Sequence, residues 1–509
     1  MKKTNFSIAI ATVWLCCLFQ TTSPAQIPTF VTDSLDAYVL EAMHVWQIPG
    51  VAVCLVKDGQ IVLEKGYGVQ RLGHPDLVDA HTVFPIASVT KTFIGTALAT
   101  LEAEGKVQLD RPLNQILPSF RMKNKLYEAQ ISIADVLSHR SGWKTFQGDL
   151  LNTESSLSNE SQLEKLGLLT PAYPIRTRFG YSNFGFLLAG EAIQPISGAH
   201  WADYLQKRFF EPLGMRRTMS NVVSIQRATN IATPHTRVNG KIEPLYNDEI
   251  NPQPYGGVYA SAHDLGIWLK VLLEKGVHDK QSIIPESAIQ KMWTSHTIIG
   301  KDFAADRNRY FKTYGLGWEI MQYQHSEVIQ HGGAYSGTLT LVGMIPSLRL
   351  GIVVLTNQDG HLLQEALKWQ IFDAFLGKSA PNYVRAIMER RLKRKAEVAV
   401  SQGVSEQPIS HVPLSVPMST LVGIYENDAY GRATIQQQND LFILKLEHHP
   451  NLQATLSPCS ATELTCTYNH PMFGKTQLPV EIDQGQIKGF TLFVDAFVEA
   501  DGYQFSKIQ

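Results

Sequence analysis

The feature that most restricts the fold is the wide separation of two strand pairs along the chain. Residues 51–64 hold apolar runs around a Lys-Asp-Gly turn, and residues 338–355 hold similar runs around a Pro-Ser turn. The rest of this part of the chain is mostly helical in period, with helices predicted at 89–104, 183–196, 262–274 and 362–376. We therefore predict an α+β fold, in which both ends of a domain form one antiparallel sheet and a helical lobe lies beside it.

A change in composition after residue 378 divides the chain. Its 509 residues exceed what one ordinary core holds, so more than one domain is expected. Residues 379–417 hold a basic stretch and then a Ser/Pro/Val-rich run, which predict a solvated helix and a linker. Residues 418–509 hold short apolar runs broken by turn residues, a pattern typical of a separate all-β domain. The main domain would then occupy residues 26–378.

The N-terminus has the pattern of a secretory signal peptide. Two lysines precede an apolar run, and a small-residue site ending at Ala25 follows it. The run is short for a membrane span, and no interior stretch approaches the ~20 apolar residues that a span needs. We expect residues 1–25 to be removed near Ala25, the protein to be exported to the periplasm or secreted, and no stable membrane insertion.

Charge and cysteine content narrow the function classes. Residues 1–25 hold two lysines and no acids, so removing them leaves 43 basic against 46 acidic residues, a formal charge of −3. This balance does not favour nucleic acid as a partner. No Cys-x-x-Cys or His-Glu-x-x-His spacing occurs, so neither a metal site nor a cofactor is expected. Cys459 and Cys466 can either close a short disulfide or remain free thiols.

A candidate nucleophile opens the helix predicted at 89–104. A serine hydroxyl is a weak nucleophile at neutral pH and needs a neighbouring base. Ser88 and Lys91 are three residues apart, so on a helix they share one face and the lysine can reach the serine oxygen. The start of a helix also favours the negative charge that develops there.

The Ser-x-x-Lys spacing alone is weak support, because chance supplies it again at Ser141 and Lys144. A glycine follows Ser141 and no apolar period continues behind it, so that second match reads as a loop. For Ser88 the structural alternative is a helix-capping serine followed by a surface lysine.

A Tyr-x-Asn motif precedes the helix predicted at 183–196. The phenol of Tyr181 can exchange a proton with serine, and a nearby lysine ammonium would lower its pKa. Asn183 can orient the lysine and a substrate amide. The same tripeptide pattern recurs at Tyr425 in the all-β region, where no function is assigned to it.

A third motif, His-Gly-Gly-Ala, lies directly before the strand predicted at 338–345. It begins at His331, and its glycines would let a ligand approach the strand backbone closely. Main-chain N–H groups there, near Gly333 and Ala334, can pair with the N–H of Ser88 as an oxyanion hole.

In this order the three motifs resemble the active-site signature of the serine β-lactamase and penicillin-binding-protein superfamily, on its class C-like branch. Further segments are similar to recurring blocks of that family, at 84–91, 136–142, 210–215 and 256–261. The resemblance covers about residues 30–378, and its fold agrees with the predicted sheet and lobe. Residues 418–509 resemble, less closely, the lipocalin-like β domain often appended to such hydrolases.

The resemblance implies a role for each motif. Ser88 would be acylated, while Lys91 and Tyr181 would share the proton transfers. The substrate would be positioned by Asn183, and the oxyanion would be bound by the N–H groups of Ser88 and Ala334. Water would then release the acyl group.

One departure from the family pattern bears on the substrate. β-Lactamases and D,D-carboxypeptidases of this superfamily usually carry Lys-Thr-Gly at the third motif, whose cation helps to hold a substrate carboxylate. A histidine with an ordinary pKa of about 6.5 is largely neutral at pH 7, so carboxylate recognition at His331 should be weaker and pH-dependent. We therefore expect a serine hydrolase of small esters or short peptides and amides, including D-configured ones.

Three alternatives remain open at this point. The first is a β-lactamase or D,D-carboxypeptidase acting on cell-wall peptides. The second is a non-hydrolytic protein that recognises penicillin or binds a polymer. The third, an α/β-hydrolase, needs a Gly-x-Ser-x-Gly elbow, and the nearest match, which contains Ser182, lacks the final glycine. The sequence does not indicate the oligomeric state.

Overall fold

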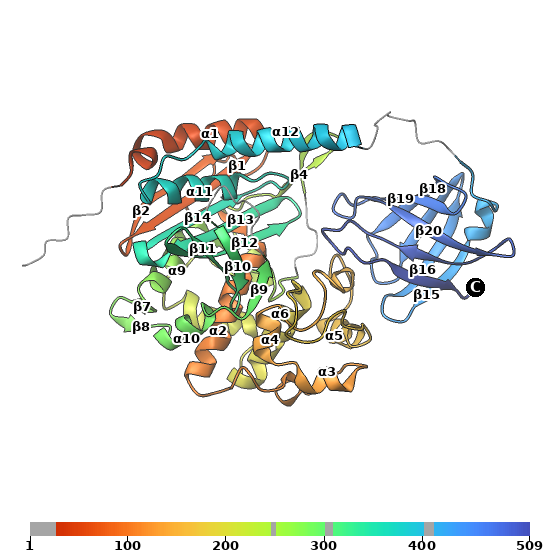
Figure 1. Ribbon diagram of the computed structural model, residues 1–509, viewed down its shortest axis with the longest axis horizontal. Coiled ribbons are helices and arrows are strands. Elements are labelled where there is room, and N and C mark those ends of the chain that lie inside the picture. The colour runs from red at the N-terminus through yellow and green to blue at the C-terminus, as the bar shows by residue number, and fades with distance from the viewer. Residues whose placement is uncertain (1–26, 246–250, 301–308, 402–411) are drawn as a thin grey trace, which may run out of the picture.

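Two structural units follow one another along the chain in the computed structural model, which describes residues 27–245, 251–300, 309–401 and 412–509 (Figure 1). The first is an eight-stranded sheet with helices on both faces and a helical lobe at one end, and the second is a closed eight-stranded barrel. The predicted α+β class with a separate all-β C-terminal unit is confirmed. The predicted signal peptide lies outside the described residues.

The large sheet joins segments from both ends of the first unit. Its strands are β1 (Gly50–Lys57), β2 (Gln60–Gly68), β9 (Thr297–Gly300), β10 (Arg309–Tyr314), β11 (Glu319–Tyr323), β12 (Ser326–Tyr335), β13 (Thr338–Ile345) and β14 (Leu350–Thr356). They lie in the order β2-β1-β14-β13-β12-β11-β10-β9. Val51 pairs with Thr356, so the N-terminal hairpin is bonded directly to the last strand, as the sequence predicted.

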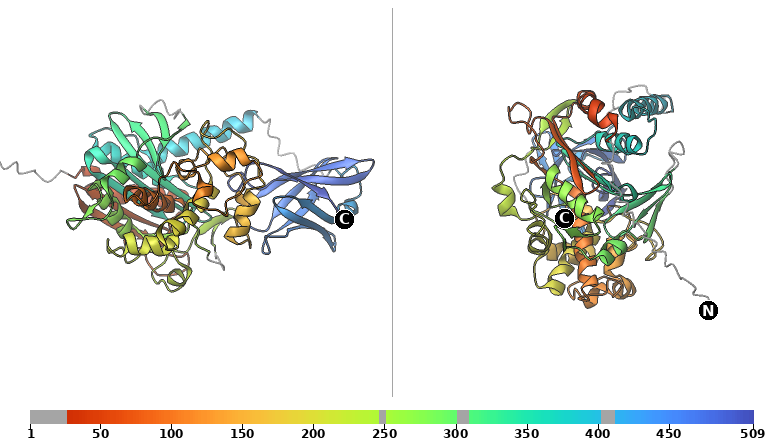
Figure 2. Two further views of the ribbon diagram at one scale, coloured as in Figure 1. Left: turned by 90° about the horizontal axis from the view of Figure 1, so that it is seen from below. Right: turned by 90° about the vertical axis from the view of Figure 1, so that its left-hand side faces the viewer.

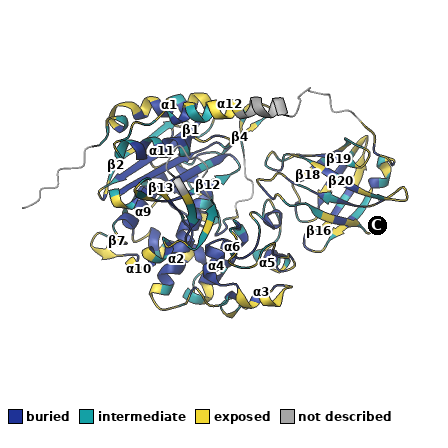
Figure 3. Cartoon of the chain, in the orientation of Figure 1, coloured by how far each residue is buried: buried dark blue, intermediate teal, exposed yellow. Residues whose placement is uncertain are grey.

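Both faces of this sheet are buried, because side chains along a strand point alternately to opposite faces. In β1 the odd-numbered residues from Val51 to Leu55 pack in one apolar cluster with helices α1 (Leu35–Trp46) and α11 (Leu363–Phe375). The even-numbered residues from Ala52 to Val56 pack in the other cluster with α9 (Ala262–Leu273). The sheet therefore forms the middle layer, as the buried strands in Figure 3 show.

The helical lobe is built around α2 (Thr90–Ala103), most of whose residues are buried, and which packs against α6 (Asn183–Ser197) and α10 (Glu286–Met292). The other helices are α3 (Lys125–Gln130), α4 (Ile133–Leu137), α5 (Asn159–Leu166), α7 (Trp201–Leu205), α8 (Val222–Gln226) and α12 (Tyr383–Ser401). Short strand pairs are β3 (Val83–Pro85) with β6 (Tyr259–Ser261), β4 (His235–Val238) with β5 (Lys241–Pro244), and β7 (Val277–His278) with β8 (Gln281–Ser282). The four helices predicted from period are confirmed to within two residues at each end.

The C-terminal barrel has side chains packed through its interior. Its strands are β15 (Gly423–Asn427), β16 (Gly431–Gln438), β17 (Leu441–Leu446), β18 (Gln453–Pro458), β19 (Glu463–Tyr468), β20 (Lys475–Asp483), β21 (Gln486–Leu492) and β22 (Tyr503–Lys507), and β22 pairs with β15 to close it. The ring of Phe490 lies 4.8 Å from that of Tyr425 and 5.4 Å from that of Phe505, measured between centroids. Aromatic contacts of this kind stabilise a filled core.

The barrel lies against the helical lobe, as the left view in Figure 2 and the polar contacts agree. Lys144 forms an ion pair with Asp501 at 2.8 Å, and the Lys165 ammonium donates to the main-chain oxygen of Ala429 at 3.1 Å. The lobe and the barrel therefore share an interface with specific polar contacts.

The two C-terminal cysteines are free thiols, the second of the two alternatives left open by the sequence. Cys466 is buried in β19, where the barrel packs around it. Cys459 is only half-buried, and its thiol donates to the main-chain oxygen of Glu463 at 3.3 Å. In the part of the chain that the structure describes, no helix combines the length and apolar character of a membrane span.

Candidate active site

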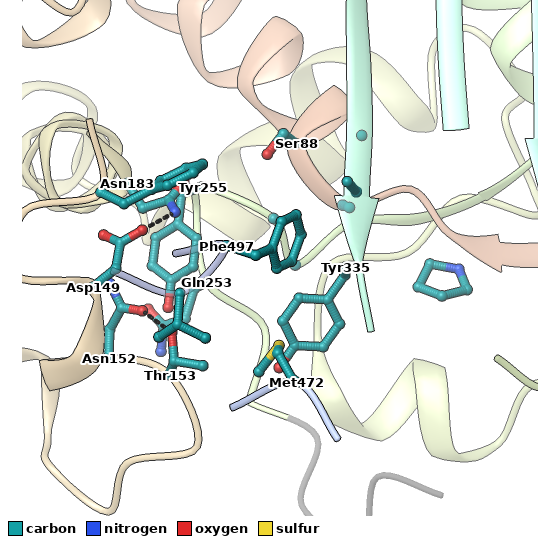
Figure 4. A pocket seen from close by; sticks show the side chains of 18 of the residues that line it. Ser88, Asp149, Asn152, Thr153, Asn183, Gln253, Tyr255, Tyr335, Met472 and Phe497 are labelled. Carbon is teal, nitrogen blue, oxygen red and sulfur yellow. Dashed lines mark hydrogen bonds between the residues drawn. The ribbon is translucent and has the colours of Figure 1, made fainter. Parts of the chain in front are cut away.

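Ser88 lies on a tight turn between β3 and α2. Ala87, before it, has a φ of +47°, in the left-handed region that costs a residue with a Cβ about 1–2 kcal/mol. The turn is held by two hydrogen bonds to a neighbouring segment: Ile86 N donates to Val258 O at 3.0 Å, and Val258 N donates to Thr90 Oγ1 at 3.0 Å. The half-buried Ser88 is thereby fixed at the start of α2, facing a cavity (Figure 4).

Lys91 lies one helical turn further along and is fully buried. Its ammonium nitrogen is 3.1 Å from Ser88 Oγ, 2.8 Å from Asn183 Oδ1 and 2.7 Å from Tyr255 O. Burial lowers the pKa of Lys91 to about 7, against the opposing effect of the Asp149 carboxylate. A substantial fraction of Lys91 is therefore neutral near pH 7 and able to accept a proton.

Tyr181 lies beside both of these groups. Its ring centroid is 4.9 Å from Lys91 Nζ, and the Ser88 hydroxyl is within hydrogen-bonding reach of the phenol. The expectation that lysine lowers the phenol pKa is wrong, since burial raises the pKa of Tyr181. Tyr181 is thus a neutral phenol, and Lys91 is the group whose pKa lies near neutrality.

His139, which the sequence analysis did not single out as a site residue, fixes the segment that carries Tyr181. Its Nδ1 accepts a hydrogen bond from Ser182 N at 3.0 Å, and its main-chain oxygen accepts one from Gly180 N at 2.9 Å. Its ring also lies 4.2 Å from that of Tyr181. The histidine occurs within the family-like block at 136–142, but only the structure reveals this contact.

Asn183 links the lysine to a buried carboxyl group. Its Nδ2 donates to Asp149 Oδ2 at 2.6 Å, while its Oδ1 accepts from Lys91. Burial, and then the nearby Glu499 of the barrel, raise the pKa of Asp149 to about 8. Sequence reasoning missed both acids, because neither belongs to a recognisable motif. The Asn183 amide thus contacts Lys91, while its role in orienting the lysine and its contact with substrate stay predictions.

His331 lies in β12 and is buried and neutral. Its Nε2 is 2.7 Å from the Tyr314 hydroxyl and its Nδ1 is 2.6 Å from Gly332 O. A carbonyl oxygen only accepts, so Nδ1 carries the hydrogen and Nε2 accepts from the tyrosine. Burial lowers the pKa of His331 to about 4. The ordinary pKa assumed from the sequence is therefore wrong, and His331 supplies no charge at neutral pH.

The two glycines after His331 differ in their surroundings. A Cβ on Gly333 would lie 2.3 Å from Ile86 O and 3.2 Å from Ser88 N, whereas one on Gly332 would have only Thr340 O at 3.8 Å. Gly333 therefore makes room for the Ser88 turn, which corrects the prediction that it makes room for a ligand.

Ala334 follows in β12, on a stretch of the strand that does not pair with β11. β11 pairs with β12 only as far as Gln330, so the outer edge of β12 beyond that point is open toward the Ser88 turn. Ala334 lines the cavity together with Ser88. Its main-chain N–H as the second oxyanion donor stays a prediction.

The cavity in front of Ser88 measures about 620 Å³ and is bounded by the lobe, the β12 edge and the barrel. In Figure 4, Asp149 and Asn183 lie on one side of it, with Tyr335 and Met472 on another. The barrel contributes a group of lining residues: Pro450, Asn451, His470, Met472, Phe497 and Val498. The second domain therefore forms part of the wall of the site.

Charge around this cavity is uneven. Among the described residues that line it, no lysine or arginine occurs, while carboxyl groups include Glu154 and Glu319. Glu319 forms an ion pair with Lys312 at 2.7 Å, and Glu154 accepts from the Tyr335 hydroxyl at 3.2 Å. The buried Lys91 reaches only the Ser88 end. A fixed cation for a substrate carboxylate is thus missing from the described lining.

The second Ser-x-x-Lys match, at Ser141, and the second Tyr-x-Asn match, at Tyr425, lie in structural positions. Ser141 is buried, and Lys144, its sequence partner, pairs with Asp501 instead. Tyr425 lies in the barrel core, where its hydroxyl donates to Leu421 O at 2.7 Å. Their exclusion from the site agrees with the sequence reasoning.

A metal site was not expected, and one group of possible ligands occurs in the described chain. Glu64, His81 and His263 place their ligand atoms within 4.8 Å of one another. His263 Nδ1 and the Glu64 carboxylate already satisfy each other at 2.7 Å, and this group does not line the Ser88 cavity.

Comparison with known proteins agrees with this geometry. The Beta-lactamase family model matches residues 35–374. Unguisins hydrolase ungD' of Aspergillus campestris (strain IBT 28561) is 25% identical over 445 residues, which cover 83% of this chain and 81% of that protein. Protein flp of Staphylococcus aureus (strain COL) is 24% identical over 348 residues, which cover 66% of this chain and 65% of that protein.

A solved structure of low sequence identity has a similar fold. The solved structure of the octameric penicillin-binding protein homologue from Pyrococcus abyssi aligns with a TM-score of 0.58 at 21% identity, over 93% of this chain and 99% of that one. The family model itself spans well over half of this chain. The chain therefore belongs to the β-lactamase family, and its fold is similar to that of this penicillin-binding protein homologue.

Proposed function

We propose that this protein is an exported serine hydrolase that forms an acyl-enzyme on Ser88 and hydrolyses small esters or short peptides and amides, including D-configured ones. The signal-like pattern of residues 1–25 supports export. The contact of Lys91 Nζ with Ser88 Oγ at 3.1 Å supports acyl transfer. The name hydrolase, carried by a relative that covers most of the chain, supports turnover over binding alone.

In the first half of the reaction the neutral Lys91 amine takes the proton of Ser88 as Oγ attacks the substrate carbonyl carbon. The carbonyl oxygen becomes an oxyanion, held by the N–H groups of Ser88 and Ala334. As the oxyanion collapses, the bond to the leaving group breaks. Tyr181 passes a proton to that group and regains one from the Lys91 ammonium.

In the second half the same groups act on water. Lys91, neutral again, accepts a proton from the water as its oxygen attacks the ester carbonyl of the acyl-enzyme. The proton returns to Ser88 Oγ as the acid product leaves. The nucleophile and base are thus regenerated without an added reactant.

The observation that carries the substrate class is the lack of a lysine or arginine among the described residues that line the cavity. Neutral His331 adds no charge, so a substrate carboxylate would be buried without a counterion and bind poorly. Neutral substrates, or ones with an amine near Glu154, suit the cavity better.

The test has two parts. A fluorophosphonate probe should label Ser88 in the wild type and nothing in the Ser88→Ala variant, as peptide mapping would establish. Turnover of a p-nitrophenyl ester and a D-aminoacyl amide should exceed that of nitrocefin and a D-Ala-D-Ala peptide, both of which carry carboxylates. Labelling elsewhere would overturn the mechanism, and a preference for nitrocefin or the D-Ala-D-Ala peptide would overturn the substrate class. A stable acyl-enzyme without turnover would identify a non-hydrolytic recognition protein.

A further inference from the structure

One fully buried carboxylate of the barrel reaches into the hydrolase unit, and the mechanism above does not use it. Glu499 lies between β21 and β22 and accepts hydrogen bonds from Gly148 N and, at 3.1 Å, from Leu150 N. Within the barrel it also accepts from the hydroxyls of Tyr430, at 3.1 Å, and Tyr503. Four donors from two domains therefore converge on a single side chain.

The two main-chain donors flank Asp149 on either side. Gly148 has a φ of +90°, so the turn that carries Asp149 begins in a conformation that favours glycine. A carboxylate that accepts both neighbouring N–H groups fixes the backbone on both sides of Asp149. The position of the Asp149 side chain is thereby tied to the docked barrel.

From Asp149 a continuous chain of hydrogen bonds leads to the nucleophile. Asn183 Nδ2 donates to Asp149 Oδ2 at 2.6 Å, and Lys91 Nζ donates to Asn183 Oδ1 at 2.8 Å. The same lysine nitrogen lies 3.1 Å from Ser88 Oγ. Every member of this chain is buried or half-buried, so solvent screens their mutual effects little.

Other barrel residues hold the same segment. His449 Nε2 donates to Leu150 O at 2.8 Å, and Ser156 N donates to His448 O at 2.8 Å. Val498, next to Glu499 in sequence, lines the cavity. The barrel thus both lines the cavity and holds the turn that carries Asp149.

We propose that Glu499 is a positioning residue for acyl transfer: by holding the amides on both sides of Asp149, it fixes the Asn183 amide that places Lys91 against Ser88. This inference rests on the proposed acylation of Ser88. Its consequence is that the hydrolase unit reaches full reactivity only with the barrel docked. Glu499 touches neither substrate nor Ser88, and it acts through Asp149.

The experiment compares the rate of Ser88 acylation by a fluorophosphonate in the full-length protein and three variants. Glu499→Ala leaves two buried N–H groups unpaired, and we expect the rate to fall about tenfold or more. Glu499→Gln keeps an acceptor of similar shape and should lose less. Asp501→Asn breaks a neighbouring interface ion pair with Lys144 and is the matched control, expected to stay within about twofold because that pair is partly exposed.

A double-variant cycle separates positioning from general support of the fold. If Glu499 acts through Asp149, the fall caused by Glu499→Gln should largely disappear in an Asp149→Asn background. If the two substitutions instead lower the acylation rate by independent factors that multiply, the proposal is overturned. It is also overturned by a Glu499→Ala rate within about twofold of the wild type, or by an equal fall in Asp501→Asn.

The same experiment distinguishes failure of the positioning role of Glu499 from failure of the proposed function. A wild type that is not labelled at Ser88 would overturn the hydrolase mechanism itself. A labelled wild type with unaffected Glu499 variants would overturn only the positioning role. Circular dichroism and thermal unfolding of each variant would show whether a lower rate comes from loss of folded protein, and Glu499→Gln, which nearly preserves shape, keeps the test open if Glu499→Ala fails to fold.

Discussion

The Lys91 ammonium nitrogen lies 3.1 Å from the Ser88 hydroxyl oxygen, and the lysine side chain is entirely shielded from solvent. Burial without a salt bridge is what brings a lysine pKa down toward neutrality. Beyond its three oxygen neighbours the nitrogen faces aromatic rings, with the ring centroids of Tyr181 and Phe186 at 4.9 and 5.4 Å. The proximity and the lowered pKa together support the role of proton acceptor that we propose for Lys91.

Acylation of Ser88 should depend on pH through Lys91. The pKa of Lys91 is about 7, and only the neutral amine accepts the proton. The second-order rate of fluorophosphonate labelling should therefore rise about tenfold per pH unit below 7 and level off above it. A stopped assay from pH 5.5 to 9 measures this. A rate that is flat across the range, or that falls with rising pH, would rule out Lys91 as the base.

Removing the Tyr181 hydroxyl should impair catalysis while leaving the fold intact. Tyr181→Phe keeps the ring that packs 4.2 Å from His139 but loses the group that passes protons. We expect kcat to fall about a hundredfold or more, with KM changed little. Steady-state kinetics on the best ester substrate check this. The control is Tyr425→Phe in the barrel, which removes a buried phenol far from the mechanism and should leave kcat unchanged.

The two glycines of the third motif should differ sharply in their tolerance of alanine. Gly333→Ala would place a Cβ 2.3 Å from Ile86 O, forcing β12 away from the Ser88 turn. We expect a loss of about 1–3 kcal/mol in the free energy of unfolding and a large loss of acylation. Gly332→Ala has its nearest neighbour at 3.8 Å and should retain its stability. Chemical denaturation of both variants tests the pair, and equal losses would contradict the close approach of β12.

The buried carboxyl group at the interface should make stability depend on pH. The pKa of Asp149 is raised from an ordinary value of 3.8 to about 8, so the folded protein keeps this proton where the unfolded chain has released it. Its stabilising contribution is complete below about pH 4 and is lost as the pH rises toward 8. Other buried titratable groups also make the free energy of unfolding depend on pH. The contribution of Asp149 is therefore measured as the difference between a variant and the wild type.

Asp149→Asn supplies that difference. The variant cannot release a proton, so its free energy of unfolding relative to the wild type should increase between pH 5 and 8 and then become constant. Urea denaturation at several pH values measures it. A constant or decreasing difference would show that Asp149 is ionised in the folded state throughout.

Much of the fold could be predicted because the relevant patterns are periodic. Helix α2 and strand β13 carry long runs of buried apolar residues, and their predicted bounds agree with the structure within a residue or two. The three motifs of the candidate site were found because each combines residues close together in sequence. The structure brings Ser88, Lys91 and Tyr181 into contact as their order implied.

What could not be predicted depends on burial and on contacts between distant segments. A phenol beside a lysine was expected to have a lowered pKa, but Tyr181 is more strongly affected by its loss of solvent. The neutral state of His331 likewise depends on Tyr314 and on burial. Glu499 is one acid among many in the sequence, and only tertiary structure carries it to Asp149.

The pairing of β1 with β14 has a consequence for how the chain acquires its fold. Strand β1 is synthesised near the start of the chain, yet its partner β14, which ends at Thr356, follows some three hundred residues later. Until β14 is available, the β1–β2 hairpin has an unpaired inner edge. The sheet of the hydrolase unit therefore depends on pairing between strands far apart in sequence, whereas the barrel strands pair mostly with their nearest neighbours in sequence.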